Sequence, residues 1–315
     1  MIKVFQRGFS MGKQVKNQHY VPKMYIKRFS PNGKKVCVWK LEGNEILTRQ
    51  EPSKYAARRY YYDASEQELH EALEEMAKLY PDAVANSDLS DEQFLEKALS
   101  RVEGATASIM DAICEDSTQL LNETNMITLI IFLHELAFRS EKYRDLIDNI
   151  RSQTIDFLDK LGVEEGAVKE LRKTGKEVQM YQLMGIHPVI DTAKSLIENY
   201  NWYVGTVPGK MKLIISDNPA QGIMLGFNDI CIPLCGDKAI IFRIADPDAP
   251  ILSQDQPVGN EITLSERSVF AYNAVQLSYA NRFLFGDKMS LSVLKMISDN
   301  KGKIMDTLHT KAMNK

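Results

Sequence analysis

The chain has 315 residues, 44% of them hydrophobic and 26% charged, as in a globular protein with a full hydrophobic core. Its formal net charge of −3 gives no overall electrostatic attraction to nucleic acid or to a membrane, although a local basic patch still allows such contacts. No apolar run reaches the roughly 18 residues of a membrane span, so we expect no membrane association.

The N-terminus and the cysteines bear on location and metal binding. Residues 1–16 are basic and lack the apolar stretch of a signal peptide, so we expect a flexible segment there, one domain over 17–315, and a cytoplasmic location. The four cysteines include no CxxC pair, whereas a structural zinc site needs about four nitrogen or sulfur ligands, so we assign no metal. No nucleotide-binding, zinc-hydrolase or serine-hydrolase motif occurs either, which leaves any cofactor unassigned.

Residues 17–62 have the composition of a small β-rich unit. Residues 36–41 and 45–48 are typical of strands, and Gly43 between them can take the positive φ of a tight hairpin turn. Residues 58–62 then read Arg-Arg-Tyr-Tyr-Tyr. This run offers the charge and stacking of a nucleic-acid contact, and the alternative is a strand with amphipathic residues at the surface.

Residues 65–200 have helical periodicity. Ser65 and Glu68 have the spacing of a capping box, and a second helix begins near Ser90 and continues towards residue 113. The third and longest helix runs from about residue 125 to 161. It is apolar on nearly every side over 126–133, which is typical of a buried helix. One or two shorter helices fill 177–200.

Residues 201–315 return to strands, at 202–204, 212–215 and 239–242, followed by a helix over 264–281 with Ser265 as its cap. The fold class is therefore α+β, with an N-terminal β-rich unit, a central helical bundle, and a C-terminal sheet with a covering helix.

The first candidate site residue is His19, within the sequence Gln-His-Tyr-Val-Pro at residues 18–22. Histidine titrates near neutrality and can act as acid or base, and the neighbouring amide of Gln18 can orient a substrate. The alternative is a structural histidine that anchors the first turn to the body of the protein.

The second candidate is Asp217, within Ser-Asp-Asn-Pro at residues 216–219, directly after the apolar run 213–215. Ligands commonly meet a sheet at the ends of its strands, where Ser216 and Asn218 would also lie. The alternative is an Asx-type turn in which Asp217 and Asn218 bind local backbone donors.

The third candidate is Arg139 on the long helix. A buried guanidinium needs a carboxylate or an anionic ligand, and Glu135 lies four residues before it on the same face. Arg139 and Arg144 together could clamp a phosphate, or Arg139 could form only an ion pair at the edge of the core. Glu103, beside a stretch of small residues, is a further partner for Arg139 or a general base.

Together these residues resemble the domain of unknown function 4238 family, which is mostly bacterial. Its opening pattern matches residues 18–22, followed by Tyr25 and the pair at 28–29, Arg-Phe. Its pair of arginines matches Arg139 and Arg144, with Ser-Glu at 140–141 in place of the usual Thr-Pro. Its later Ser-Asp-x-Pro segment matches 216–219, and Asn273 and Arg282 match the helix that follows. The resemblance spans about 17–286 and implies a shared site, but no activity.

Our leading hypothesis is a hydrolase acting on phosphodiesters, in RNA or DNA. His19 would be the general acid or base, Asp217 a second acid or base or the group that orients His19, and Arg139 the group that stabilises charge on phosphate. The substrate would be positioned by further polar side chains, namely Gln18, Glu103, Arg144, Ser216, Asn218, Asn273 and Arg282.

Two other functions remain open. One is a non-catalytic sensor that binds a small anionic ligand or nucleotide with the same arginine and amide groups. The other is a protein-interaction module in which the polar motifs hold the fold together.

Overall fold

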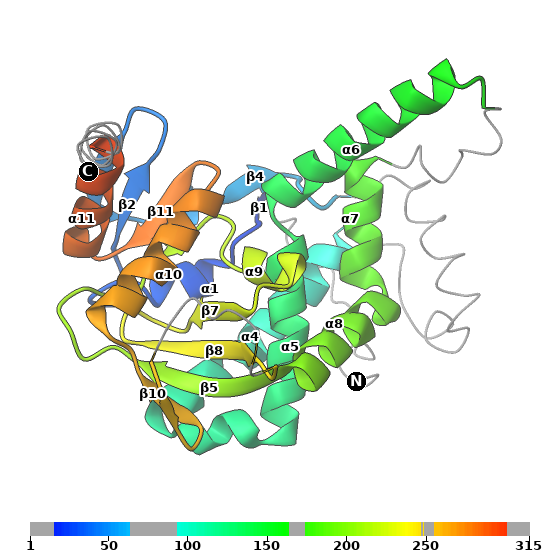
Figure 1. Cartoon of the computed structure of the whole chain (residues 1–315). Coiled ribbons are helices and arrows are strands. Elements are labelled where there is room, and N and C mark those ends of the chain that lie inside the picture. Colours follow the sequence, from blue (N-terminus) through cyan, green and yellow to red (C-terminus); the bar gives the residue numbers. More distant parts are fainter. Residues whose placement is uncertain (1–15, 64–92, 164–173, 247, 249–254, 301–315) are drawn as a thin grey trace, which may run out of the picture.

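The computed structural model describes residues 16–63, 93–163, 174–246, 248 and 255–300 (Figure 1). The N-terminal elements are β1 (Asn17–His19), α1 (Lys23–Lys27), β2 (Val36–Lys40), β3 (Glu45–Gln50), the short 3-10 helix η2 (Pro52–Lys54) and β4 (Ala57–Arg59). The helical part contains α4 (Phe94–Glu115), the 3-10 helix η3 (Ser117–Leu121), α5 (Glu123–Phe138), α6 (Glu141–Lys160), α7 (Gly175–Met184) and α8 (Ile186–Asn199).

The C-terminal part returns to strands, as the sequence predicts. Its elements are β5 (Tyr200–Thr206), β6 (Ile215–Ser216), α9 (Gln221–Leu225), β7 (Asp229–Pro233), β8 (Lys238–Ile244), β9 (Pro257–Val258), β10 (Glu261–Thr263), α10 (Glu266–Tyr279), β11 (Phe283–Gly286) and α11 (Lys288–Asp299). This order confirms the α+β class. The capping box at Ser65 and the helix start at Ser90 lie outside the described residues.

The strands in the described part of the chain form three sheets. β1 pairs antiparallel with β4, and a five-stranded sheet has the order β7-β8-β5-β10-β9, in which only the β5–β10 pair is parallel. The third sheet is antiparallel, with the order β3-β2-β11-β6. Because β2 and β3 share this sheet with strands from the C-terminal part, the N-terminal residues form no separate unit.

The hairpin between β2 and β3 confirms the predicted turn. Gly43 has φ +79° and Asn44 has φ +49°, a region that glycine and asparagine adopt at lower cost than other residues.

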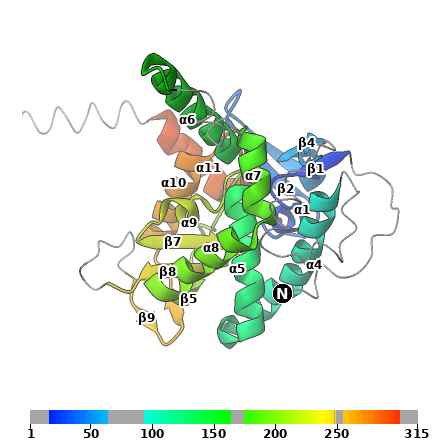
Figure 2. The same ribbon diagram turned by 90° about the vertical axis from the view of Figure 1, so that its right-hand side faces the viewer.

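Helix α5 forms the centre of the core. Its side chains are buried on nearly every face from Leu129 to Ala137, and it packs against α4, α7, α8 and α9. Figure 2 shows α5 running between α4 and α8. The prediction of a buried helix is thus confirmed, and α5 brings its polar residues into the interior with it.

The predicted single helix over 125–161 is wrong, because the chain breaks between α5 and α6. Arg139 ends α5, and the hydroxyl of Ser140 accepts a hydrogen bond from the backbone N–H of Tyr143 at 3.2 Å, so α6 begins with its own cap. From there α6 projects away from the body of the molecule (Figure 1).

The predicted strand over 212–215 is also shorter than expected. Side chains, rather than a neighbouring strand, bind its backbone: the carbonyl and amide groups of Asn273 bond the N–H of Ile214 and the C=O of Lys212, and Ser290 accepts from the N–H of Lys212. Helix α10 has the predicted Ser265 cap but ends at Tyr279, before Asn281 and Arg282.

Among the described residues, no helix is both long enough and apolar enough to cross a membrane.

Candidate functional site

Arg139 is the centre of a buried polar cluster. Its guanidinium is 1% exposed and donates to Glu103 Oε1 at 2.9 Å, to the hydroxyl of Tyr62 at 3.3 Å, and to the backbone carbonyl of His19. The ion pair predicted within the helix, with Glu135, is replaced by the one with Glu103 on α4. Arg139 therefore joins α5 to α4 and to the N-terminal segment, which are far apart in the sequence.

Two further carboxyl groups lie near Arg139 without forming an ion pair. Glu96 on α4 and Glu135 on α5 are buried, and the Oε2 atom of each has no hydrogen-bond partner within the described part of the chain. Burial raises the pKa of Glu96 to about 7, although the positive charge of Arg139 acts to lower it. Burial also raises the pKa of Glu135 well above its ordinary value. Glu96 therefore keeps its proton to a much higher pH than an ordinary glutamate.

His19 lies at the end of β1, with its backbone held by Arg139. The Nε2 atom of its ring is buried and has no partner among the residues that the structure describes. Burial, together with the charges of Arg139 and Lys23, lowers the pKa of His19 to about 4, although the ring also bonds the backbone of Ser53. The imidazole is therefore neutral at pH 7 and able to accept a proton at Nε2.

Gln18 is fully buried, and its side chain joins β1 to residues 62 and 63. Its amide nitrogen donates to Asp63, and its carbonyl accepts from the backbone N–H of Tyr62 at 2.5 Å. Gln93, just before α4, donates to the same oxygen of Asp63 at 3.1 Å. The amide predicted to orient a substrate is thus engaged by protein groups, and these bonds tie β1 to the start of α4.

Asp217 is 1% exposed and binds backbone groups that are remote in the sequence. Its two carboxylate oxygens accept from the N–H groups of Asn281 at 2.7 Å and Arg282 at 2.8 Å. The Asx-turn alternative, in which local donors bind this carboxylate, is therefore not what the structure has. Burial raises the pKa of the Asp217 carboxyl despite these bonds.

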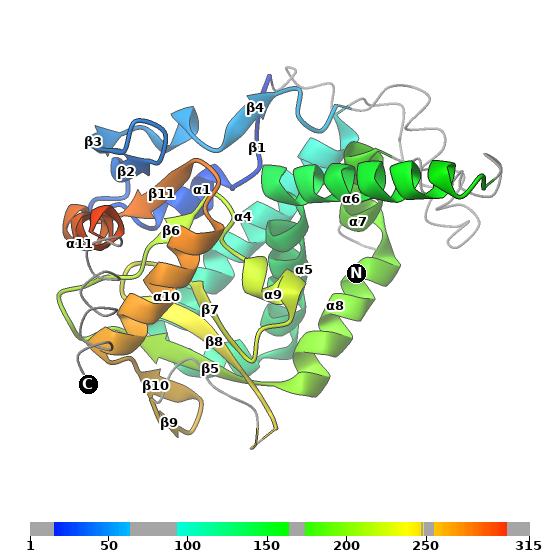
Figure 3. The same ribbon diagram turned by 45° about the horizontal axis from the view of Figure 1, so that its top comes forward.

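Arg282 connects Asp217 to the residue that follows His19. Its guanidinium donates to the hydroxyl of Tyr20 at 2.8 Å and lies 3.0 Å from Glu141, which also pairs with Arg58. Figure 3 shows the β1–β4 ribbon and the start of α6 at the same edge of the molecule. The motif at residues 18–22 is thus bound to α5 through Arg139 and to the motif at residues 216–219 through Arg282.

The two arginines predicted to clamp a phosphate contact different groups. Arg144 donates to Gln179 Oε1 at 2.6 Å and to the backbone carbonyl of Tyr61 at 3.1 Å, and it stacks on the Tyr61 ring at 3.7 Å. A phosphate on either arginine would have to displace these partners.

The remaining predicted residues lie around β6 and α10. Ser216 binds Gln276 at 2.9 Å, and Asn273 holds the backbone of 212–214 as described above. Asn218 donates to Gln221 at 2.5 Å, and its own Oδ1 is buried without a partner in the described ranges.

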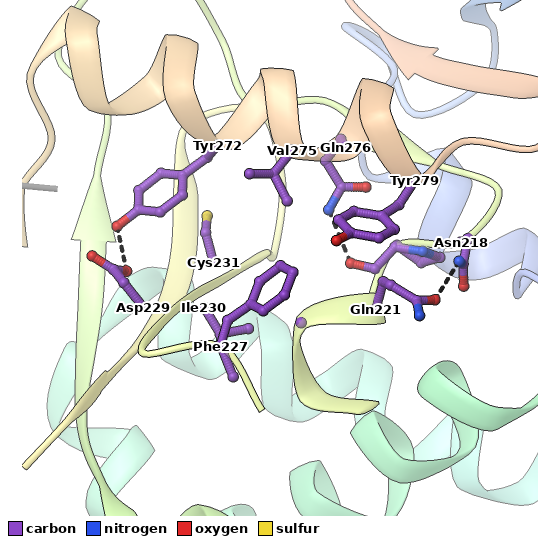
Figure 4. A pocket seen from close by; sticks show the side chains of 12 residues that line it. Asn218, Gln221, Phe227, Asp229, Ile230, Cys231, Tyr272, Val275, Gln276 and Tyr279 are labelled. Atoms are coloured by element: carbon purple, nitrogen blue, oxygen red, sulfur yellow. Dashed lines mark hydrogen bonds between the residues drawn. The ribbon is translucent and has the colours of Figure 1, made fainter. Parts of the chain in front are cut away.

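Two pockets flank α9. Asn218 and Gln221 help to line a narrow one, partly open to solvent, between α10 and β7 (Figure 4). The second lies between α7, α8 and α9 and includes His187 and Asp191. Neither of these two pockets is lined by His19, Arg139, Asp217 or Asn273.

Sequence reasoning missed Glu96, although a signal for it exists. Glu96 and Glu103 are seven residues apart, so they lie on one face of α4, two turns from each other. In the described part of the chain, no three His, Cys, Asp or Glu side chains are grouped so as to hold a metal ion.

Comparison with known proteins gives one family match. The model described as "Protein of unknown function (DUF4238)" matches residues 17–290, which includes every element from β1 to the start of α11. No curated protein and no solved structure matches the chain.

Proposed function

Because the chain belongs to the DUF4238 family, whose description assigns no activity, we propose a function from its own side chains: acid–base hydrolysis of phosphodiesters in RNA or DNA. The observation that carries the proposal is that two buried atoms near Arg139, Nε2 of His19 and Oε2 of Glu96, have no hydrogen-bond partner within the described residues; Oε2 of Glu135 is a third such atom. Unsatisfied buried polar groups are rare in folded proteins, and a catalytic role is one of the explanations for them.

His19 is the general base and Glu96 the general acid in this proposal. Their pKa values, about 4 and about 7, are reversed relative to the ordinary order of histidine and glutamate. Between these two values the imidazole is neutral and the carboxylic acid is protonated, which is the pairing that acid–base catalysis requires. Glu96 takes the second acid–base role first considered for Asp217, whose oxygens are both bonded to backbone N–H groups.

Arg139 is a positioning residue in this scheme, because its donors bind Glu103, Tyr62 and the carbonyl of His19. It fixes the backbone of His19, and its positive charge adds to burial in lowering the pKa of the imidazole. Asp217 acts at longer range, through Arg282 and Tyr20.

The surface beside His19 supports an anionic polymer as substrate. In the β1–β4 ribbon His19 pairs with Ala57, and the exposed Arg59 and Tyr60 follow, with the guanidinium 5.7 Å from the ring centroid. Lys23, which begins α1 four residues after His19, is also exposed. Cations bind backbone phosphates, and aromatic rings stack on unpaired bases. RNA is the simpler substrate for an acid–base pair, because its own 2′-hydroxyl can be the nucleophile.

The test is cleavage of fluorescently labelled single-stranded RNA and DNA by the purified chain and two variants, His19→Gln and Glu96→Gln. We expect each variant to lose about 100-fold or more in rate, the usual contribution of one acid or base. His187→Gln, an exposed histidine on α8, is the matched control and should keep the parent's rate. If both variants cleave as fast as the parent, or the parent cleaves neither polymer, the proposal is wrong.

A second candidate is an interaction module in which these polar groups only stabilise the fold. It is favoured by the donors of Arg139 and Arg144 and by the oxygens of Asp217, which already have protein partners. It predicts that the His19 and Glu96 variants change the melting temperature while the parent itself cleaves no nucleic acid. We propose the cytoplasm as the location for either function.

A further inference from the structure

Helix α6 carries an apolar stripe that is exposed to solvent. Its members are spaced four, seven and four residues apart along one side of the helix, namely Leu146, Ile150, Phe157 and, at the C-terminal cap, Leu161. Ile150 is 52% exposed, and Phe157 and Leu161 are each 61% exposed. This α6 stripe extends over roughly 22 Å of the helix. A contiguous exposed apolar surface of this kind marks an interaction site.

Helix α7 packs against α6 from the opposite side. There Asp148 accepts from the backbone N–H of Gly175 at 2.8 Å, and Arg144 donates to Gln179 at 2.6 Å. Beyond its first turns α6 projects away from the body of the molecule, in both Figure 1 and Figure 2. The α6 stripe takes no part in these contacts with α7 and is accessible to a partner.

The α6 stripe is symmetric about its midpoint, which lies beside Gln153. If a second α6 lies antiparallel across it, Leu146 meets Leu161 of the second copy, and the reverse. Ile150 likewise meets Phe157. A two-fold axis requires this reciprocal pairing. The exposed Gln153 then meets its own copy, where the two side-chain amides can hydrogen-bond across the axis. One polar residue within an apolar helix seam fixes the register of the pair.

The polar residues beside the α6 stripe favour the antiparallel direction. Along one flank lie four exposed residues, Asp145, Asn149, Asp156 and Lys160. In the antiparallel pair Asp145 lies opposite Lys160, and Asp156 lies opposite Asn149. A parallel pair would instead place each aspartate against its own copy, and like charges at such positions repel. The charges therefore complement each other only when the two helices run in opposite directions.

We propose that α6 is the interface of a homodimer, in which it packs antiparallel against α6 of a second copy. Burial of the α6 stripe drives the association, and Gln153 with the Asp145–Lys160 pairs sets its register and direction. A membrane surface would be the other occupant for such a stripe. It attracts helices whose polar side is rich in lysine and arginine, whereas α6 has five acidic and four basic residues.

This inference goes beyond the proposed hydrolase and does not depend on it. The α6 stripe lies outside the Arg139 cluster, and the readout is the mass of the particle in solution, so either proposal can fail without the other.

Sedimentation velocity of the full chain, over about a hundredfold range of concentration, tests the proposal, because a dimer held by one helix face dissociates on dilution. At the upper end the particle mass should approach twice that of one chain. Ile150→Asp places a charge within the stripe and should raise the concentration needed for dimerisation about tenfold or more. Ile197→Asp is the matched control, since Ile197 lies on α8 and is 54% exposed, and it should dimerise like the parent.

Charge exchange and cross-linking test the antiparallel direction. Asp145→Lys should weaken the dimer, and Asp145→Lys combined with Lys160→Asp should restore it. A chain with Leu146→Cys, mixed with a chain with Leu161→Cys, should form a covalent dimer through these two positions on mild oxidation. Leu146→Cys alone should form no link between its two copies of residue 146. Mass spectrometry of the linked peptides separates these bonds from those of the native cysteines.

A parent that stays monomeric over the whole concentration range overturns the proposal, and so does one that sediments with phosphatidylserine vesicles while remaining monomeric. Dimerisation that Ile150→Asp leaves unchanged overturns it as well. A link between two copies of residue 146 would show a parallel pair and contradict the antiparallel arrangement.

Discussion

At the scale of single residues, Arg139 shows how a buried charge organises its surroundings. A guanidinium that is 1% exposed must have partners, and it takes them from three segments: His19, Tyr62 and Glu103. This requirement could be inferred from sequence, because an arginine at the end of an apolar helix cannot remain unpaired. Glu103 was named as a candidate partner from the sequence, whereas Tyr62 and the carbonyl of His19 could not be inferred, since neither is near Arg139 in the chain.

Arg139→Lys tests whether the planar group itself matters. Lysine keeps the charge but carries it on a single ammonium nitrogen in place of a planar fork of donors. It therefore cannot bind Glu103, Tyr62 and the His19 carbonyl in the same geometry. We expect the free energy of unfolding to fall by about 3 kcal/mol, the usual consequence of breaking a buried ion pair. Urea denaturation measures this, with the exposed Arg59→Lys as the matched control. Equal losses in the two variants would show that Arg139 is not the centre of the cluster.

At the scale of elements, local chemistry accounts for the features that the sequence predicted correctly. The hydroxyl of Ser265 caps α10, and Gly43 and Asn44 adopt the positive φ of the hairpin turn. Both features depend only on residues that are close in the chain. The features that were missed depend on distant groups. Residues 212–214 lie outside the strand: Asn273 and Ser290 bind the backbone of Lys212 and Ile214, and the carbonyl of Gly236 accepts from the N–H of Leu213.

The break between α5 and α6 is the element boundary on which the cluster depends, since it places Arg139 at the end of α5. Ser140→Ala removes the hydroxyl that accepts from the N–H of Tyr143, and we expect a loss of about 1 kcal/mol in the free energy of unfolding. Ser152→Ala, at an exposed position within α6, should cost nothing measurable. Thermal and urea unfolding of the pair measure the difference. Unchanged stability in Ser140→Ala would mean that the cap does not define the break.

At the scale of the whole molecule, the candidate site is built from segments that only the tertiary fold brings together. The sequence singled out His19, Arg139 and Asp217 as candidates, since each stands next to a strand or at a buried helix. The family resemblance implies a shared site for them, and the structure links them by hydrogen bonds through Glu103, Arg282 and Tyr20 rather than around either of the two pockets beside α9. Glu96 joins them only because α4 packs along α5, a contact that no local pattern specifies.

The most direct test of the central claim, that His19 and Glu96 near Arg139 carry out hydrolysis, is the pH dependence of kcat/KM on labelled RNA. The base must be unprotonated and the acid protonated, so the rate should rise as pH increases through about 4, where His19 loses its proton, and fall through about 7, where Glu96 loses its own. In Glu96→Gln the falling limb near pH 7 should disappear together with most of the rate. A rate that keeps rising above pH 7 in the parent, or a falling limb that persists unchanged in Glu96→Gln, would contradict the account.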